Sequence, residues 1–370
     1  MKYLLIMALI AGLAACSDDG PEESLEEPIQ EGATETTDGE AGQAEEPEPI
    51  EVVTEQLEVP WAIEKSGETL FITERNGSIV TIEEGRDTRA EVVLEHDELA
   101  EGEGGLLGFV LSPDYAEDGR AFVYHTYQEE GQILNRIAVI SQSDDDGQWI
   151  EEEEVLAGIP GGRIHNGGRL AMGPDEKLYA TTGDAGIEEL AQEREAMAGT
   201  ILRLELDGTV PDDNPWEDSY VYSYGHRNPQ GLAWDEDGTL YSSEHGSSAY
   251  DEINLIEAGV NYGWPIVRGD ETEEGLSAPL IHSGEDTWAP SGAAVAKDVL
   301  YVAGLRGEAI YALNLQTSEF VTWLEGFGRI RDLFVDGQSL YFITNNRDGR
   351  GVPQDSDDYL IKVDLEQQER

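Results

Sequence analysis

Short apolar runs alternate with short polar turns from about Ile50 to the end of the chain. Gly, Asp and Asn separate the runs, as in Gly67-Glu68-Thr69 before Leu70-Phe71-Ile72. Stretches of 3.6-residue period, which would indicate amphipathic helices, are almost absent from this part of the sequence. The pattern therefore predicts an all-β protein made of short strands.

One unit recurs along this region: a turn with Gly or Asp, an apolar strand, a polar crossing and a second apolar strand. Six copies are marked by residues that stand 52, 56, 62, 60 and 40 positions apart, namely Leu70, Phe122, Leu178, Leu240, Leu300 and Leu340. The units predict a six-bladed β-propeller of four-stranded antiparallel blades, because each blade buries both faces against its neighbours and closure of the ring leaves only short edges. One large β-sandwich, or two smaller ones, is the alternative.

The N-terminus has the features of an export signal. Met1-Lys2 precedes an apolar run from Tyr3 to Leu13, which is too short to span a bilayer. The run ends in Leu13-Ala14-Ala15-Cys16, which resembles the bacterial lipoprotein box. We expect residues 1–15 to be removed and Cys16 to be lipidated, with an ordinary signal and an incidental Cys as the alternative.

The segment after the signal, residues 16–50, differs from the rest of the chain in composition. Positions 17–50 carry 13 Asp or Glu and no Lys or Arg, interleaved with Pro, Gly, Ser and Thr, a composition that cannot bury a core. We expect an acidic disordered tether, followed by one propeller domain over residues 51–370. Export and the lipid would place the protein at the cell envelope, on the periplasmic side or the outer surface, with the lipid as its only membrane contact.

The charge balance limits the partners of the protein. Among 370 residues, 79 Asp and Glu against 22 Lys and Arg give a formal charge of -57, which repels nucleic acids and anionic membrane surfaces. The basic residues are 17 Arg and 5 Lys, a balance that keeps a surface hydrated at high salt, so either a saline habitat or a merely acidic exported protein fits. A single Cys excludes intramolecular disulfides, Cys-based zinc sites and a covalently attached haem.

Two polar loops stand out between the predicted strands. His165 lies in the glycine-rich loop from Gly161 to Leu170, and Arg227, Asn228 and Gln230 share the loop from Gly225 to Leu232. In a propeller, loops at one end of the channel collect residues from every blade, so such loops can form one ligand site. A solvated loop histidine and a well hydrogen-bonded turn are the alternatives.

A third motif is the pair Arg329 and Arg331 in Gly328-Arg329-Ile330-Arg331-Asp332-Leu333. In an extended strand the two side chains point to the same face. Two neighbouring guanidiniums repel each other, so we expect an anion between them. That anion is either a ligand or an Asp or Glu of this acidic chain.

These segments, in this order, resemble the soluble glucose/sorbosone dehydrogenases, a family that includes the periplasmic aldose sugar dehydrogenases and uses pyrroloquinoline quinone (PQQ). The resemblance runs from Val59 to Lys362 and rests on Val59-Pro60-Trp61, Glu103 to Gly108, Ser112 to Tyr115, His165 to Arg169, Thr182-Gly183-Asp184, Gly225 to Leu232, Asp251 to Ile256, Asn261 to Pro265 and Arg329 to Asp332. Each segment alone is a weak signal, but their shared order is specific. The resemblance implies a six-bladed propeller with the quinone over the channel mouth.

The resemblance also implies the chemistry of the site. His165 matches the family's catalytic base, Asp184 matches an active-site Asp, and Glu103 falls beside the substrate. The implied reaction oxidises the C1 hydroxyl of an aldose to a lactone by hydride transfer to calcium-bound PQQ. The electrons then pass to an external acceptor, a quinone or a cytochrome.

The cofactor-binding residues are implied in the same way. Arg227, which also counts as catalytic, Asn228 and Gln230 match the loop at the reactive carbonyls of the quinone. Arg306, Arg329 and Arg331 match the family's basic residues that hold the carboxylates of the quinone. Gly246 and Ser247 match the residues whose backbone carbonyls bind calcium. Relatives commonly have Pro at the position of Ser247, but a backbone carbonyl can serve from either residue.

General chemistry agrees with these assignments. PQQ is a tricarboxylate, which an acidic chain repels unless arginines gather at one place. A neutral His is a suitable base near pH 7. A six-bladed calcium-dependent lactonase or related hydrolase, and a propeller that only binds a partner, are the alternatives, because fold does not fix function.

Overall fold

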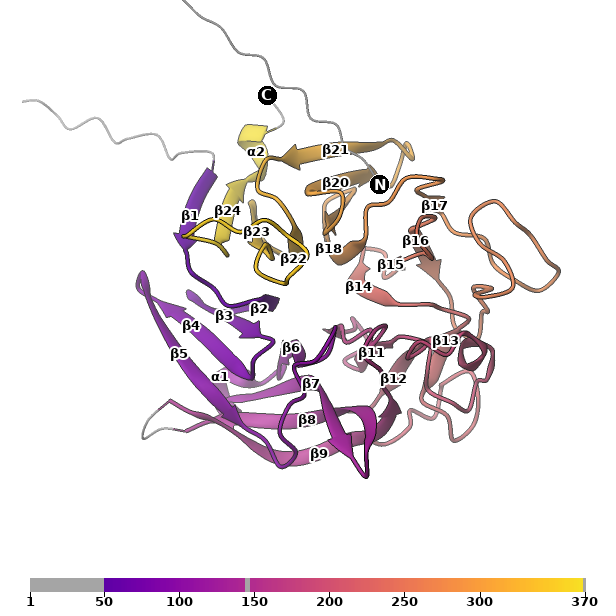
Figure 1. Ribbon diagram of the computed structural model, residues 1–370, viewed down its shortest axis with the longest axis horizontal. Helices are drawn as coiled ribbons and strands as arrows, with labels where there is room; N and C mark the ends of the chain where they lie inside the picture. Colours follow the sequence, from indigo (N-terminus) through magenta and orange to yellow (C-terminus); the bar gives the residue numbers. More distant parts are fainter. Residues whose placement is uncertain (1–49, 144–146, 369–370) are drawn as a thin grey trace, which may run out of the picture. The chain divides into compact units, whose positions relative to one another are not determined.

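The computed structural model describes residues 50–143 and 147–368. The predicted signal, Cys16 and nearly all of the tether lie outside these residues. In the described part almost all regular structure is β-strand, which confirms the all-β prediction (Figure 1).

Four of the sheets contain four strands each within the described residues. The first sheet has the spatial order β1 (Ile50–Thr54), β24 (Leu360–Asp364), β23 (Ser339–Thr344) and β22 (Ile330–Asp336), and the second has the order β10 (Leu170–Met172), β11 (Leu178–Thr182), β12 (Thr200–Leu204) and β13 (Val221–Tyr224). The third consists of β14 (Pro229–Trp234), β15 (Leu240–Glu244), β16 (Glu252–Ile256) and β17 (Ile281–His282). The fourth consists of β18 (Pro290–Ala296), β19 (Val299–Gly304), β20 (Ala309–Asn314) and β21 (Phe320–Glu325). Because β1 pairs antiparallel with β24, the first of these sheets joins the two ends of the described chain.

The fifth sheet has eight strands. They are, in order, β2 (Pro60–Ser66), β3 (Thr69–Glu74), β4 (Ser78–Glu83), β5 (Arg86–Val93), β9 (Trp149–Pro160), β8 (Gln132–Gln142), β7 (Arg120–Glu129) and β6 (Leu106–Leu111). Its halves, β2 to β5 and β6 to β9, are each antiparallel. They meet through a short parallel pairing of Val92 and Val93 with Trp149 and Ile150.

Three short helices complete the described chain: α1 (Tyr115–Asp118), the 3-10 helix η1 (Glu188–Gln192) and α2 (Leu365–Gln368). No helix in residues 50–143 or 147–368 has the length and apolar character needed to cross a bilayer.

The repeat read from the sequence coincides with the strands. The six marker residues lie in the second strand of successive four-stranded units, that is, in β3, β7, β11, β15, β19 and β23. The first strands of these units, β2, β6, β10, β14, β18 and β22, contact one another in order, and β22 contacts β2. These inner strands therefore form a closed ring, from which the sheets extend outward (Figure 1).

The core lies between neighbouring sheets. Between the halves of the eight-stranded sheet, the buried rings of Phe71 and Phe109 meet Trp149 edge to face, at centroid distances of 5.9 and 5.7 Å. Similar apolar clusters join each sheet to the next, including Ile63 and Ile72 with Tyr341 across the point of closure. Burial of each large side chain contributes about 1.5 to 3 kcal/mol, so the inner strands form a firm support for the loops at their ends.

Candidate active site

A cavity of about 290 Å³ lies where the loops enter the inner strands. Six residues singled out from the sequence line it: Glu103, His165, Arg227, Gly246, Arg306 and Arg329. Three of the loops stand just before β6, β10 and β14, and a fourth before β22. The ring of inner strands thus brings together segments that are more than two hundred positions apart in the chain.

His165 and Asp184 form a hydrogen-bonded pair at this cavity. His165 Nδ1 lies 2.7 Å from Asp184 Oδ1, and the Asp184 side chain is fully buried. The Gly186 N–H donates to the same oxygen at 2.7 Å. A carboxylate that accepts from Nδ1–H leaves Nε2 of the ring free to accept a proton, which is the arrangement of a general base.

The backbone holds this pair at close range. His165 has φ of +57°, a left-handed conformation that costs a non-glycine residue about 1 kcal/mol or more and is frequent at functional sites. A Cβ at Gly183 would lie 2.0 Å from the His165 carbonyl oxygen. Only glycine therefore allows the chain before Asp184 to pass so close to His165.

Glu103 holds the backbone of His165. Its Oε2 accepts from the His165 backbone N–H at 2.9 Å, and its Oε1 accepts from Arg350 Nη2 at 2.8 Å. Burial by itself would raise the pKa of Glu103, but these partners hold the pKa at about 2. Glu103 is therefore an anion at neutral pH.

Four arginines supply positive charge to the cavity, namely Arg350, which pairs with Glu103, and Arg227, Arg306 and Arg329. The Arg227 guanidinium lies 5.3 Å from the centre of the Trp264 ring, and its Nη1 donates to the His245 carbonyl at 3.3 Å. Arg329 Nη2 lies 2.6 Å from Asp348 Oδ2, so the chain itself supplies an anion to this arginine. Arg306 is exposed at the edge of the cavity.

Arg331, Asn228 and Gln230 lie outside the cavity lining. Arg331 Nη1 donates to Gln230 Oε1 at 2.8 Å, and burial lowers the pKa of Arg331 to about 9, so it stays charged at neutral pH. Asn228 Oδ1 accepts from the Gly167 N–H at 3.0 Å, which ties the Arg227 loop to the His165 loop. In this position the three residues brace the walls of the cavity.

Gly246 lines the cavity, and Ser247 lies beside it in an adjoining small pocket. A Cβ at Gly246 would lie 2.2 Å from the Ala249 carbonyl oxygen, so the loop turns tightly here. Asp251 Oδ1 accepts from the Gly246 N–H at 2.9 Å and its Oδ2 from the Ala289 N–H at 2.8 Å, which fixes the loop to the start of β18. Over the described residues, no three His, Cys, Asp or Glu side chains gather as a metal-ligand cluster.

Three buried side-chain nitrogens in these loops have no hydrogen-bond partner among the described residues. They are Arg227 Nε and His245 Nε2, from residues that line the cavity, and Asn228 Nδ2, from a residue outside the lining. Buried donors in folded proteins are almost always paired. The unpaired Arg227 Nε, together with the other arginines of the lining, therefore fits an anionic, acceptor-rich ligand.

The comparisons with known proteins agree on one family. The family model for glucose/sorbosone dehydrogenase matches residues 57–355. The chain belongs to this family. Quinoprotein glucose dehydrogenase B of Acinetobacter calcoaceticus is 34% identical over 248 residues, which are 59% of this chain and 50% of that protein. Aldose sugar dehydrogenase YliI of Escherichia coli K12 is 31% identical over 241 residues, 62% of this chain and 65% of that protein.

A solved structure is similar over almost its whole length. The PQQ-bound form of aldose sugar dehydrogenase from Streptomyces coelicolor superposes with a TM-score of 0.80 at 38% identity, covering 85% of this chain and 97% of that chain. This chain therefore shares the fold of that aldose sugar dehydrogenase. The chain spans less than two thirds of the length of both curated relatives described above.

Reasoning from the sequence missed several residues that this family member places at the site. His245, Asp251 and Arg350 line the cavity, and burial lowers the pKa of His245 to about 4, so that it is neutral near pH 7. Trp264 donates its indole N–H to Asp184 Oδ2 at 2.9 Å. Trp264 belongs to the segment from Asn261 to Pro265 that carries the family resemblance, but the resemblance gave it no role. No pattern in the sequence indicated Arg350.

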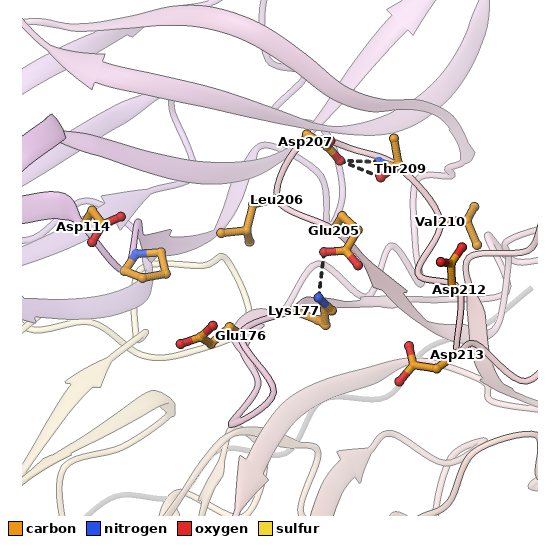
Figure 2. Close-up of a pocket in the computed structure, with 11 residues that line it drawn as sticks. Asp114, Glu176, Lys177, Glu205, Leu206, Asp207, Thr209, Val210, Asp212 and Asp213 are labelled. Carbon is orange, nitrogen blue, oxygen red and sulfur yellow. Dashed lines mark hydrogen bonds and ion pairs between the residues drawn. The ribbon is translucent and has the colours of Figure 1, made fainter.

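A larger cleft of about 930 Å³ lies at the opposite ends of the strands, between the segments that follow β6 and β12. Figure 2 shows its carboxylates, with Asp114, Glu176, Asp207 and Asp212 around the opening. Its single basic lining residue, Lys177, pairs with Glu205 at 2.8 Å. The lining of this cleft shares no residue with the lining of the candidate active site.

Proposed function

We propose that this protein is a PQQ-dependent aldose sugar dehydrogenase that oxidises the C1 hydroxyl of an aldose to a lactone. The observation that carries the proposal is His165, hydrogen-bonded to Asp184, in one cavity with four arginines in a chain of net charge -57. Family membership and the similarity to a PQQ-bound relative support it.

The arginines are suited to hold the carboxylates of the quinone. Arg227, Arg306 and Arg329 all line the cavity that His165 and Gly246 also line. Charge-assisted hydrogen bonds from guanidinium to carboxylate are short and strong, which offsets the repulsion from the acidic surface. The backbone carbonyls of Gly246 and Ser247 are hard oxygen ligands of the kind that calcium accepts.

In the proposed reaction, the chain's own residues handle the proton. His165 Nε2 accepts the proton of the sugar hydroxyl, and Asp184 stabilises the resulting imidazolium through Nδ1–H. Glu103, anionic and fixed by Arg350, is placed to accept hydrogen bonds from sugar hydroxyl groups. Bound PQQ with calcium would supply the two-electron acceptor for the hydride that leaves C1, and the electrons would then pass to an external quinone or cytochrome.

We also infer six blades. The eight-stranded sheet consists of two antiparallel four-stranded halves joined by two parallel residue pairs, which is a weak contact compared with the full antiparallel pairings inside each half. Counting the halves separately gives six four-stranded units around the ring of inner strands.

We further propose export and attachment by a lipid on Cys16. The support is the sequence alone, namely the charged start, the short apolar run and Leu13-Ala14-Ala15-Cys16. Replacing Cys16→Ser should move the protein from the membrane fraction to the released fraction. Equal membrane recovery of the variant and the wild type would contradict the anchor.

Reconstitution tests the enzymatic proposal. Cofactor-free protein is loaded with PQQ and calcium and then mixed with a panel of aldoses and an artificial electron-accepting dye. Dye reduction that depends on both sugar and quinone is the expected result. Lactone hydrolysis without dye reduction would favour the hydrolase, and the absence of both activities would favour a binding protein.

A further inference from the structure

Trp264 touches two parts of the proposed active site at once. Its indole N–H donates to Asp184 Oδ2 at 2.9 Å, and its ring lies under the Arg227 guanidinium, with 5.3 Å between Cζ and the ring centre. Asp184 in turn holds His165 at 2.7 Å. One side chain therefore joins the base and the cation of the cavity.

The indole N–H takes the oxygen of Asp184 that the histidine does not use. Oδ1 accepts from His165 Nδ1 and from the Gly186 N–H, whereas Oδ2 accepts from Trp264. An indole N–H is a donor only and does not titrate. It therefore fixes the orientation of the carboxylate and draws off part of its negative charge at every pH.

Two hydrogen bonds to its own backbone hold Trp264 in place. Its N–H donates to the Gly225 carbonyl at 2.9 Å, and its carbonyl accepts from Gln192 Nε2 at 2.6 Å. Gln192 is also hydrogen-bonded to Asn261, with Asn261 Nδ2 donating to Gln192 Oε1 at 2.8 Å. Through Gly225, Trp264 is therefore hydrogen-bonded to the loop that contains Arg227.

We propose that Trp264 is a positioning residue that tunes the basicity of the His165 and Asp184 pair through its N–H and orients Arg227 through its ring. The proposal rests on the proposed function, because it takes His165 as the base. Without the N–H donor, Asp184 would bind the Nδ1–H of His165 more strongly and favour the imidazolium form. The base would then work only at higher pH.

Other charged or titratable residues line the same cavity as His165. They are Glu103, Arg227, His245, Asp251, Arg306, Arg329 and Arg350. A Trp264→Phe change leaves all of these groups in place and keeps an aromatic ring under Arg227. A change in the behaviour of His165 in this variant would therefore report on the missing N–H.

The primary experiment uses the cofactor-free full chain and proton NMR. The Nδ1–H resonance of His165, identified by its loss in His165→Ala, should move downfield in Trp264→Phe because its hydrogen bond to Asp184 becomes stronger. Trp216→Phe is the matched control, since Trp216 also lies under an arginine, Arg194, at 5.0 Å, but packs on Tyr224 and is not among the hydrogen-bond partners of Asp184. An unchanged resonance in Trp264→Phe would overturn the proposal, whether or not the protein oxidises sugars.

Kinetics of the PQQ-loaded protein give the second measurement. In Trp264→Phe the acid limb of kcat/KM should move upward by roughly 0.5 to 1 pH unit, which is part of the strength of one hydrogen bond to a charged group, because the effect reaches His165 only through Asp184. Activity lost near neutral pH should return at higher pH. An equal loss at all pH values would indicate a merely structural role and contradict the tuning.

Two further variants separate the N–H from the ring. Trp264→Leu removes the ring as well and should weaken PQQ binding about twofold to fivefold more than Trp264→Phe, the size of an exposed cation–π contact. Equal PQQ affinity of the two variants would refute the orientation of Arg227. If Trp264→Phe fails to fold, benzothienylalanine at this position keeps the shape and removes only the N–H, and the same NMR shift is expected.

Discussion

Two cavities at opposite ends of the strands differ in both size and charge. The candidate active site measures about 290 Å³ and contains Arg227, Arg306, Arg329 and Arg350, whereas the cleft of Figure 2 measures about 930 Å³ and contains Lys177 as its single basic lining residue. The same acidic sequence forms both. The difference teaches that volume is a poor guide to function here, and that the placement of scarce cations is a better one.

The reason lies in the cost of gathering like charges. Four arginines around a small cavity repel one another unless anions compensate them, and Glu103 and Asp348 compensate only Arg350 and Arg329. Such an arrangement is stabilised by an anionic ligand. The carboxylates of the large cleft face solvent, where water and salt screen them.

The largest expected effect is on turnover at the small cavity. His165→Ala should bind PQQ but lose about 10² to 10⁴ in rate, because a general base is removed. His96→Ala is the control, since His96 packs on Tyr127 and does not line the cavity. Equal turnover per bound quinone in His165→Ala and the wild type, measured by dye reduction, would remove His165 from catalysis.

The pH dependence of stability should differ in sign between Glu103 of the small cavity and Glu64 among the inner strands. The pKa of Glu103 is held at about 2, below its ordinary 4.5, so its stabilising contribution is present above pH 4.5 and is lost as the pH falls toward 2. Glu64 lines a separate cavity of about 500 Å³ among the inner strands. Burial and the nearby Asp332 raise the pKa of Glu64 to about 8, so its contribution is present below pH 4.5 and is lost as the pH rises through 8.

Substitutions should reveal this contrast in denaturant unfolding. Glu103→Gln should lower the free energy of unfolding at pH 7 by up to about 3 kcal/mol, and the difference should shrink below pH 4.5. Glu64→Gln should be more stable than the wild type at pH 9 and equal to it in acid. The same sign for both variants at pH 9 would contradict the assigned charge states.

A smaller effect is expected from single cations. Arg306→Ala should weaken PQQ binding roughly threefold to tenfold, since one exposed charge-assisted contact is lost. Lys177→Ala, the matched change in the large cleft, should leave the affinity unchanged in the same titration. Equal weakening by both variants would mean that the cations act through long-range charge and not through contact.

The smallest effect is expected from salt. Molar sodium or potassium chloride should raise the midpoint of thermal unfolding by a few degrees, because it screens the repulsion in a chain of charge -57. The triple variant Asp114→Asn, Glu176→Gln and Asp212→Asn, which neutralises the rim of the large cleft, should reproduce part of this gain at low salt. A lower midpoint at high salt would show that self-repulsion does not limit stability.

Much of the fold could be predicted from the sequence because strand signals are local. The alternation of apolar and turn residues around Leu70, Phe122 and Leu178 located the second strands of successive units. The parallel contact of Val92 with Trp149, which merges two units into one sheet, could not be predicted. It pairs edge strands far apart in sequence, and no local pattern encodes such a pairing.

The candidate active site likewise has residues that could be predicted from the sequence and contacts that could not. The sequence by itself determined that His165, Arg227 and Arg329 are candidates, because unusual residue types stand in glycine-rich loops before apolar strands, whereas Asp184 became a candidate only through the resemblance to the family. Only the tertiary structure decided that Arg329 is paired with Asp348, that Arg331 lies outside the cavity lining, and that Trp264 holds Asp184. Residue type and strand period are properties of neighbours along the chain. Which charges meet depends on the closure of the ring, which brings loops from distant units within hydrogen-bonding distance.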